Sequence, residues 1–212
     1  MGSENRPPRT TKGRERSGSR RTAPWGENGQ HDEDLALARV AARDSLAARQ
    51  LYRAHADRVF RAVARVMGRW HPDVEDVVQQ VFVTAFLRPE TFEGRSRLST
   101  WLVGIAARRA VDAVRASERR RRWAKLKRRF GMESEGAVDQ RAHVRAEAER
   151  YLDLLRVEQR AVFVLCEVEG YTLKEVSEMT AVSVSTLHSR LKAARRRLDE
   201  ALSDERGEEG AS

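Results

Sequence analysis

Apolar residues recur at helical spacing in three segments of the first half of the chain. The first segment has a stripe at intervals of three and four residues, made of Tyr52, Ala56, Val59, Phe60, Val63, Val66 and Met67. In the second, Asp73 is placed to cap a helix whose stripe contains Val74, Val77, Val78, Val81, Phe82, Ala85 and Phe86. The third starts near Ser99, runs to about Arg115 and buries Leu98, Trp101, Leu102 and Ile105. Such stripes predict helices that pack together as a small bundle.

A different helical pattern occupies residues 170–198, GYTLKEVSEMTAVSVSTLHSRLKAARRRL. Gly170 is placed to end one helix, and Thr172 and Glu175 have the spacing of a capping box that opens the next. Residues 181–183 then form a tight turn, and Ser183 can cap a second, longer helix. One face of that helix contains Val184, Leu187, Leu191, Ala194 and Leu198. The segment is therefore predicted to be a helix-turn-helix.

The residues outside these two helical units form an N-terminal segment, a linker and a C-terminal tail. Residues 1–33 are rich in Arg, Ser, Gly and Pro and almost free of apolar side chains, which predicts a disordered basic arm. No proline follows Pro89, which favours an all-α body. We expect an all-α fold with two small helical domains at 34–116 and 150–202, a charged linker at 117–149, and a frayed polar tail at 203–212. The first half of the linker is a candidate continuation of the preceding helix.

The charge balance favours an anionic partner. The sequence has 41 Lys and Arg against 32 Asp and Glu, for a formal net charge of +9, which fits nucleic acid or an anionic membrane surface. The single cysteine, Cys166, excludes an internal disulfide and is most simply a core residue, so a reducing cytoplasm is expected. The five histidines are scattered, so no metal site or cofactor is expected. No segment approaches the about 18 apolar residues of a membrane span.

Two surfaces have residue types that suit binding. On the second helix of the helix-turn-helix, a polar stripe contains Ser185, His188, Ser189, Lys192 and Arg196. Hydroxyl groups near a helix start suit base edges in the major groove, and basic groups further on suit phosphates. A solvated face whose basic end complements the helix dipole is the simpler alternative. In the segment 92–115, Phe92 and Trp101 alternate with arginines, which suits unpaired DNA strands, although Trp101 is better suited to the core than to stacking on bases.

Several motifs occur together in one order: LYRAHADRVFRAVARVMG, DVEDVVQQVFVTAF, FEGRSRLSTWLVGIAARRAVDAVR, a charged linker, and EQRAVFVLCEVEGYTLKEVSEMTAVSVSTLHSRLKAARRRL. This order resembles an extracytoplasmic-function (ECF) RNA polymerase sigma factor from about Asp34 to Leu202. The resemblance implies a sigma factor that directs core RNA polymerase to promoter DNA, in a stress or envelope response, from the cytoplasm or, in the holoenzyme, the nucleoid. It implies contacts with the polymerase beta-prime clamp helices and beta flap, and an anti-sigma factor as a further partner.

The resemblance also assigns residues to these contacts. The first domain resembles sigma-2, whose core-polymerase-binding residues would be Asp76, Gln79, Gln80, Val83 and Leu87. Its minus-10 DNA-binding residues would be Phe92, Arg95, Ser96, Arg97, Ser99, Thr100, Trp101, Arg108 and Arg115. The second domain resembles sigma-4, and its minus-35 DNA-binding residues would be Ser183, Ser185, Thr186, His188, Ser189, Arg190, Lys192 and Arg196.

The chain departs from the family pattern at three places. Arg108 stands where the family usually has Asn, which bears on minus-10 base preference. Arg156 and Val157 stand before Glu158 where the family commonly has Leu-Pro, which bears on the helix start there. The linker is unusually basic over residues 119–129, where it either touches nucleic acid or extends the preceding helix into solvent.

Two other functional classes compete with the sigma-factor interpretation. A helix-turn-helix transcription regulator that does not bind core polymerase needs only the second domain, and it leaves the pattern of residues 74–101 without a use. A magnesium-dependent nuclease would use Asp73, Glu75 and Asp76. These carboxylates open a helix, where the helix dipole favours acidic residues, so we expect no enzyme.

Overall fold

The computed structural model describes residues 36–40, 43–129 and 147–209, and every regular element in those ranges is helical. The expected basic arm and the linker residues 130–146 lie outside the described residues. The elements are α2 (Ser45–Met67), α3 (Val74–Leu87), the 3-10 turn η1 (Pro89–Thr91), α4 (Leu98–Arg129), α5 (Glu147–Leu152), α6 (Val157–Phe163), the π-helical segment η2 (Val164–Val168), α7 (Leu173–Thr180) and α8 (Val184–Glu209).

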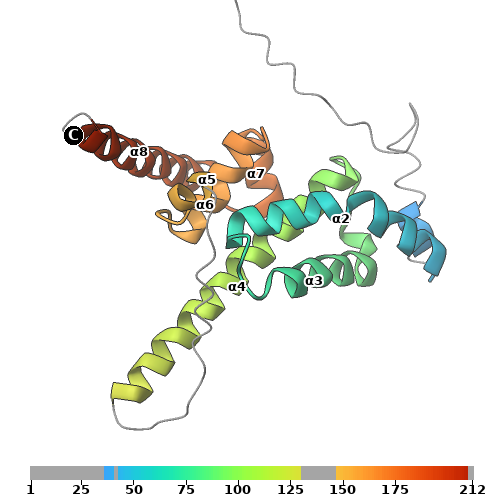
Figure 1. Cartoon of the computed structure of the whole chain (residues 1–212). Coiled ribbons are helices and arrows are strands. Elements are labelled where there is room, and N and C mark those ends of the chain that lie inside the picture. Colours follow the sequence, from blue (N-terminus) through green and yellow to red (C-terminus); the bar gives the residue numbers. More distant parts are fainter. Residues whose placement is uncertain (1–35, 41–42, 130–146, 210–212) are drawn as a thin grey trace, which may run out of the picture.

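The first unit is a bundle of α2, α3 and the first half of α4 (Figure 1). Asp44 caps α2 by accepting hydrogen bonds from the amides of Leu46 and Ala47 at 2.9 and 3.1 Å. The core between the three helices consists of fully enclosed aliphatic side chains, among them Leu51, Val59, Val63, Val81, Leu98 and Val103. The predicted bundle is therefore present, with its predicted helices.

The stripe predicted for α2 is rotated in the structure. Tyr52 and Phe60 are 44% and 39% exposed, whereas Leu51 and His55 are buried. Two apolar faces are available on this helix, and packing against α3 and α4 selects the one that contains Leu51, Val59 and Val63. Asp73 occupies the N-cap position of α3, but its side chain makes no capping hydrogen bond and instead accepts one from Arg120 at 3.2 Å.

The second unit contains α5 to α8, with α7 and α8 forming the predicted helix-turn-helix. Val176 of α7 and Leu187, Leu191 and Ala194 of α8 are buried as expected. Val184 is 46% exposed, which corrects its place on the apolar face, because the first turn of α8 extends beyond the helices that cover the rest. Cys166 is half-buried and packs against the core, and burial raises the pKa of its thiol.

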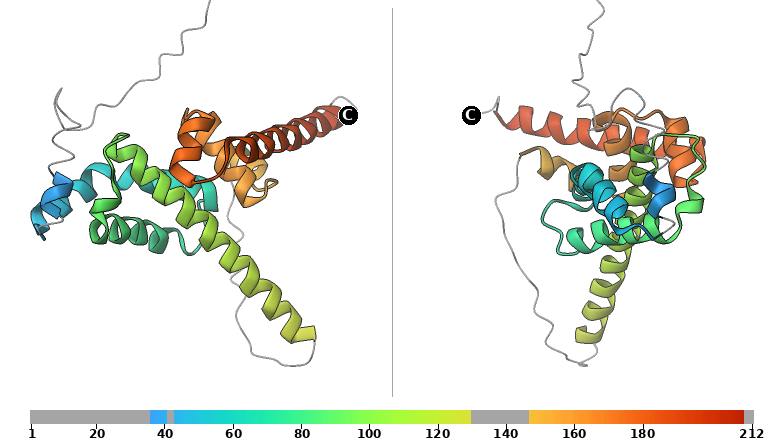
Figure 2. Two further views of the ribbon diagram at one scale, coloured as in Figure 1. Left: turned by 180° about the vertical axis from the view of Figure 1, so that it is seen from behind. Right: turned by 90° about the vertical axis from the view of Figure 1, so that its right-hand side faces the viewer.

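Two helices are longer than the sequence pattern indicates. α4 continues through the expected end of the first domain to Arg129, so the basic first half of the linker is helical. α8 reaches Glu209, so residues 203–209 are helical where a frayed tail is expected. Both helices project from the body of the molecule, in different directions (Figures 1 and 2). Their projecting ends are mostly charged, although Trp123 and Leu126 of α4 and Leu202 of α8 are also exposed there.

The two units pack against each other. α7 and α6 lie on α4, and α6 also touches α2, so that buried residues of both units form one continuous apolar cluster. Figure 2 shows the second unit beside the first part of α4, where Gly104 meets Met179 and Arg115 meets Glu158. α4 is therefore the element that the two units share.

Candidate nucleic-acid interface

Capping interactions set the geometry of the helix-turn-helix. The Glu175 amide donates to Thr172 Oγ1 at 3.2 Å, and the Thr172 amide donates to Glu175 Oε2 at 2.8 Å, which confirms the predicted capping box. The Thr172 amide also lowers the pKa of Glu175, because it stabilises the charged carboxylate. Ala181 ends α7 with φ of 56°, a left-handed conformation usually left to glycine. Ser183 Oγ then accepts from the Thr186 amide at 3.3 Å and opens α8.

Exposed hydroxyl groups gather at the start of α8. The Ser183 and Thr186 hydroxyls are 2.8 Å apart, the Ser183 and Ser185 hydroxyls are 3.2 Å apart, and Ser189 donates to the Ser185 carbonyl at 3.0 Å. Exposed hydroxyl groups that bond to one another can exchange these partners for base edges at small cost. His188, Lys192 and Arg196 are also exposed further along the helix. This part of the predicted minus-35 set therefore lies on accessible surface.

The loop before α4 and the first turns of that helix bring together the predicted strand-binding residues. The rings of Phe92 and Trp101 have centroids 5.3 Å apart, and both side chains are half-buried against the core. Trp101 thus packs in the bundle and still exposes part of its ring. Of the others, Arg95 and Arg97 are exposed, Arg95 in an ion pair with Glu93, and half-buried hydroxyls come from Ser96, Ser99 and Thr100.

The exposed face of α3 contains the predicted polymerase-binding residues. Positions 76, 80, 83 and 87 fall within a narrow sector of a helix with 3.6 residues per turn, and position 79 lies beside it. Two of the side chains are apolar and exposed, Val83 by 53% and Leu87 by 75%. All five members of the predicted set are exposed: Asp76, Gln79, Gln80, Val83 and Leu87.

Sequence reasoning missed Tyr52 as a member of the same surface. Its ring centroid lies 4.8 Å from that of Phe82, and with Phe86 it lines a shallow cavity between α2 and α3 of about 270 Å³. The helical stripe in the sequence places Tyr52 in the core. Nothing in the sequence distinguishes the exposed edge of such a stripe from its buried centre.

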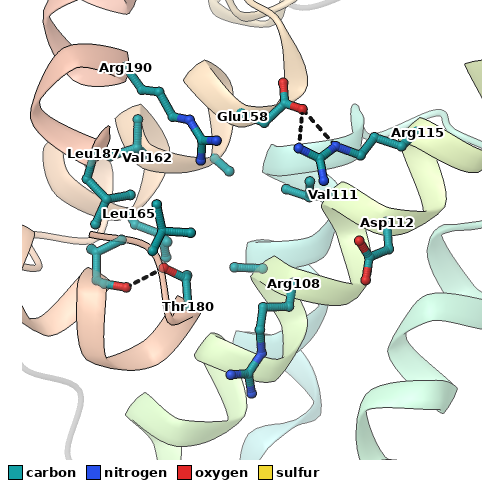
Figure 3. A pocket seen from close by; sticks show the side chains of 14 residues that line it. Arg108, Val111, Asp112, Arg115, Glu158, Val162, Leu165, Thr180, Leu187 and Arg190 are labelled. Atoms are coloured by element: carbon teal, nitrogen blue, oxygen red, sulfur yellow. Dashed lines mark hydrogen bonds and ion pairs between the residues drawn. The ribbon is translucent and has the colours of Figure 1, made fainter. Parts of the chain in front are cut away.

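Three of the predicted DNA-binding arginines lie at the contact between the two units, where Arg108 and Arg115 remain exposed and Arg190 is half-buried. Arg108 and Arg115 of α4 and Arg190 of α8 line a cavity of about 310 Å³, which Figure 3 shows from close by. Arg115 Nε donates to Glu158 Oε1 at 2.7 Å. Burial alone would raise the pKa of Glu158, but its helix-start amide and the Arg115 guanidinium outweigh burial and lower that pKa.

A buried arginine and a glycine hold the units together elsewhere. Arg160 is only 4% exposed, donates to the Arg65 carbonyl at 2.5 Å and pairs with Asp153 at 2.7 Å. Gly104 allows close approach on the other side, because a Cβ there would lie 3.0 Å from Met179 Cβ. A glycine in the interior of a strong helical pattern is a sequence signal for such an approach. For Arg160 we find no comparable signal.

The three carboxylates that a magnesium-dependent nuclease would use do not form a metal site. Asp73 pairs with Arg120, and Glu75 and Asp76 are exposed. Within the described ranges, the structure has no group of three or more His, Cys, Asp or Glu side chains suited to a metal ion. Over the same ranges, none of the helices combines the length and apolar character that crossing a membrane requires.

Comparison with known proteins gives matches for both units. The Sigma-70 region 2 family matches residues 51–121, and the Sigma-70 region 4 family matches residues 145–198. The ECF RNA polymerase sigma factor SigM of Mycobacterium tuberculosis is 31% identical over 178 residues, which cover 82% of this chain and 87% of SigM. SigE of Mycolicibacterium smegmatis is 31% identical over 172 residues, covering 77% of this chain but only 64% of SigE.

Solved structures show the same fold. The structure of CnrH in complex with the cytosolic domain of CnrY matches with a TM-score of 0.54 and 25% identity, over 81% of this chain and 97% of that one. The sigma factor RpoE in complex with the anti-sigma factor NepR from Bartonella quintana matches with a TM-score of 0.52 and 22% identity, over 73% and 96% of the two chains.

Proposed function

The chain belongs to the ECF RNA polymerase sigma factors, and from this premise we propose how its residues divide the work of transcription initiation. A sigma factor directs core polymerase to promoters, so the chain is an initiation factor. We assign residues 34–116 to core binding and minus-10 recognition, residues 150–202 to minus-35 recognition, and no covalent chemistry to either. The supporting observation is that one chain has both an exposed α3 face and a helix-turn-helix with an exposed hydroxyl-rich start.

The α3 face is the proposed contact with the beta-prime clamp helices. Exposed Val83 and Leu87 supply apolar area, and Asp76 and Gln80 beside them supply hydrogen bonds, which is the composition of a protein-binding patch. Tyr52 extends this patch onto α2. The beta flap is the proposed partner of the second unit. A helix-turn-helix regulator that works without polymerase has no use for such a face.

Promoter contacts follow from the accessible residues described above. The ring pair of Phe92 and Trp101 and the exposed Arg97 are the proposed site for the unpaired minus-10 strand, since aromatics stack bases and arginines hold phosphates. The start of α8 is the proposed reader of the minus-35 duplex. Arg108 and Arg115 are exposed at the edge of the interunit cavity and remain proposed minus-10 contacts, although Arg115 must give up its ion pair with Glu158 to bind DNA.

A protein regulator is the further proposed partner. CnrH is paired with the cytosolic domain of CnrY, and the RpoE structure contains the anti-sigma factor NepR. We propose that this chain has an anti-sigma factor of its own and works in the cytoplasm, on the nucleoid once it is in the holoenzyme, in a stress or envelope response.

Abortive transcription with sigma-free core polymerase tests the proposal. The purified chain is added with a library of promoter fragments, beside the double variant Asp76→Ala, Gln80→Ala. The matched control is Gln50→Ala, Asp57→Ala, which removes the same two side-chain types from exposed positions on α2. Specific transcripts are expected from the chain and the control, and none from the α3 variant.

Two results would contradict the proposal. Sequence-specific DNA binding without polymerase association or transcripts would move the assignment to the helix-turn-helix regulator. Undiminished transcription by the α3 variant, with the control unchanged, would remove the clamp-binding assignment.

A further inference from the structure

The far end of α4 projects beyond the rest of the protein. After Ser117 every described side chain of the helix, residues 118–127, is exposed. Figures 1 and 2 show this end leaving the body as a straight rod. We call residues 119–129 the basic extension. At 1.5 Å per residue it is about 16 Å long, close to the length of about five base pairs.

Cations dominate the basic extension, and few of them are paired. Two of them form ion pairs, Arg120 with Asp73 at 3.2 Å and Arg122 with Glu118 at 3.4 Å. Among the residues that the structure describes, no anionic partner is found for the others with described side chains: Arg119, Arg121, Lys125 and Lys127. Like charges one turn apart, such as Arg121 and Lys125, destabilise a helix by about 0.2–0.5 kcal/mol. A polyanion would remove that repulsion.

The distribution of these cations around the helix identifies the kind of polyanion. Successive residues turn by about 100°, so Arg119 to Arg122 point to all sides of the rod. Trp123 and Leu126, which are 64% and 43% exposed, have Arg119 between them. A helix that lies on a membrane instead separates an apolar face from a charged one. A helix in or along the major groove has phosphates of both strands beside it, so cations on several sides are used.

We propose that the basic extension binds the phosphate backbone of duplex promoter DNA next to the minus-10 element. α4 begins at the ring pair of Phe92 and Trp101, so one helix presents both the strand site and the duplex site. The inference rests on the family function, promoter binding by the holoenzyme, and not on the individual base-contacting residues. It adds a second, non-specific duplex contact to the one made by α8.

The salt dependence of promoter binding by the holoenzyme tests this contact. Each phosphate that a protein neutralises contributes about 0.9 to the slope of log K against log salt for B-DNA. Glutamine keeps high helix propensity, so the test variant changes three unpaired cations: Arg121→Gln, Lys125→Gln and Lys127→Gln. The control removes the same charge from exposed arginines elsewhere: Arg49→Gln, Arg61→Gln and Arg150→Gln. Binding is measured by fluorescence anisotropy between 50 and 200 mM salt.

The expected result is a slope shallower by about 3 in the test variant, with the control close to the unchanged chain. An equal slope in all three holoenzymes, or an equal change in both variants, would overturn the proposal. So would a change that persists on a fragment whose minus-10 strand has no flanking duplex, because the ligand would then be single-stranded. If the unchanged holoenzyme binds no promoter at all, it is the proposed function that fails, since the slopes then have no reference.

Discussion

Replacing Gly104 with a larger residue is expected to separate the two units of the protein. A Cβ at this position would lie 3.0 Å from Met179 Cβ and 3.2 Å from the Met179 carbonyl oxygen, and neither atom can move without its backbone. Overpacking of this kind costs about 1–3 kcal/mol. The gain in helix propensity from Gly to Ala, about 1 kcal/mol, is the same in the packed and separated forms. The whole steric cost therefore destabilises the packed form. Its population relative to the separated form falls by about 5- to 150-fold.

Small-angle scattering on the free chain measures this shift. Gly104→Ala is expected to raise the radius of gyration slightly and Gly104→Leu clearly, while both keep the helical circular dichroism of the unchanged chain. Ala124→Leu is the control, because it enlarges an exposed side chain on the same helix. Separation also frees Arg115 from its ion pair with Glu158, so duplex DNA affinity should rise in parallel. An unchanged radius in a folded Gly104→Leu variant would refute the steric argument.

Two further predictions concern stability. Desolvation, followed by the Arg58 charge, lowers the pKa of His55 to about 4. An unfolded His titrates near pH 6.5, so the unfolded chain takes up the proton first as the pH falls. The free energy of unfolding should therefore fall by about 2 kcal/mol from pH 7.5 to pH 5. Urea denaturation at both pH values checks this. His55→Leu should lose most of the dependence, with a remainder from His71, whose pKa burial also lowers, and the exposed His188→Gln should keep it. A His55→Leu variant that retains it in full would contradict the assignment. Arg160→Met should lower the free energy of unfolding by about 1–2 kcal/mol, because the part-buried Arg65 carbonyl and Asp153 lose a hydrogen-bond donor. A loss under about 0.5 kcal/mol, typical of surface sites, would contradict the role given to the buried guanidinium.

Local chemistry explains which features could be predicted from the sequence. The capping box of Thr172 and Glu175, the Ser183 cap and the left-handed Gly170 depend on neighbours within a few residues, and all three are present. The buried stripe of α3 likewise follows from spacing, because four of the residues on its other face are charged or amide side chains: Glu75, Asp76, Gln79 and Gln80.

Features that depend on distant partners could not be predicted. α2 has two usable apolar faces, so only the positions of α3 and α4 decide that Tyr52 is exposed and Leu51 buried. Asp73 pairs with Arg120, 47 residues away, instead of capping α3. Arg160 reaches the Arg65 carbonyl across 95 residues, and the turn of Arg190 toward α4 follows from the same packing of units. The sequence shows which residue types the candidate surfaces contain. It does not show which of these side chains are exposed to solvent.

The length of α4 has a mechanical consequence. With 32 residues it rises about 48 Å as one rigid rod. It is fixed about 9 Å from its start, where Gly104 meets Met179. A tilt of about 10° around that point displaces the near end by about 1.5 Å and the far end by about 6.5 Å, in opposite directions. The helix can thus pivot about its contact with the second unit. A partner that shifts the second unit therefore moves the cations at the far end of α4 several times further than the ring pair at its start.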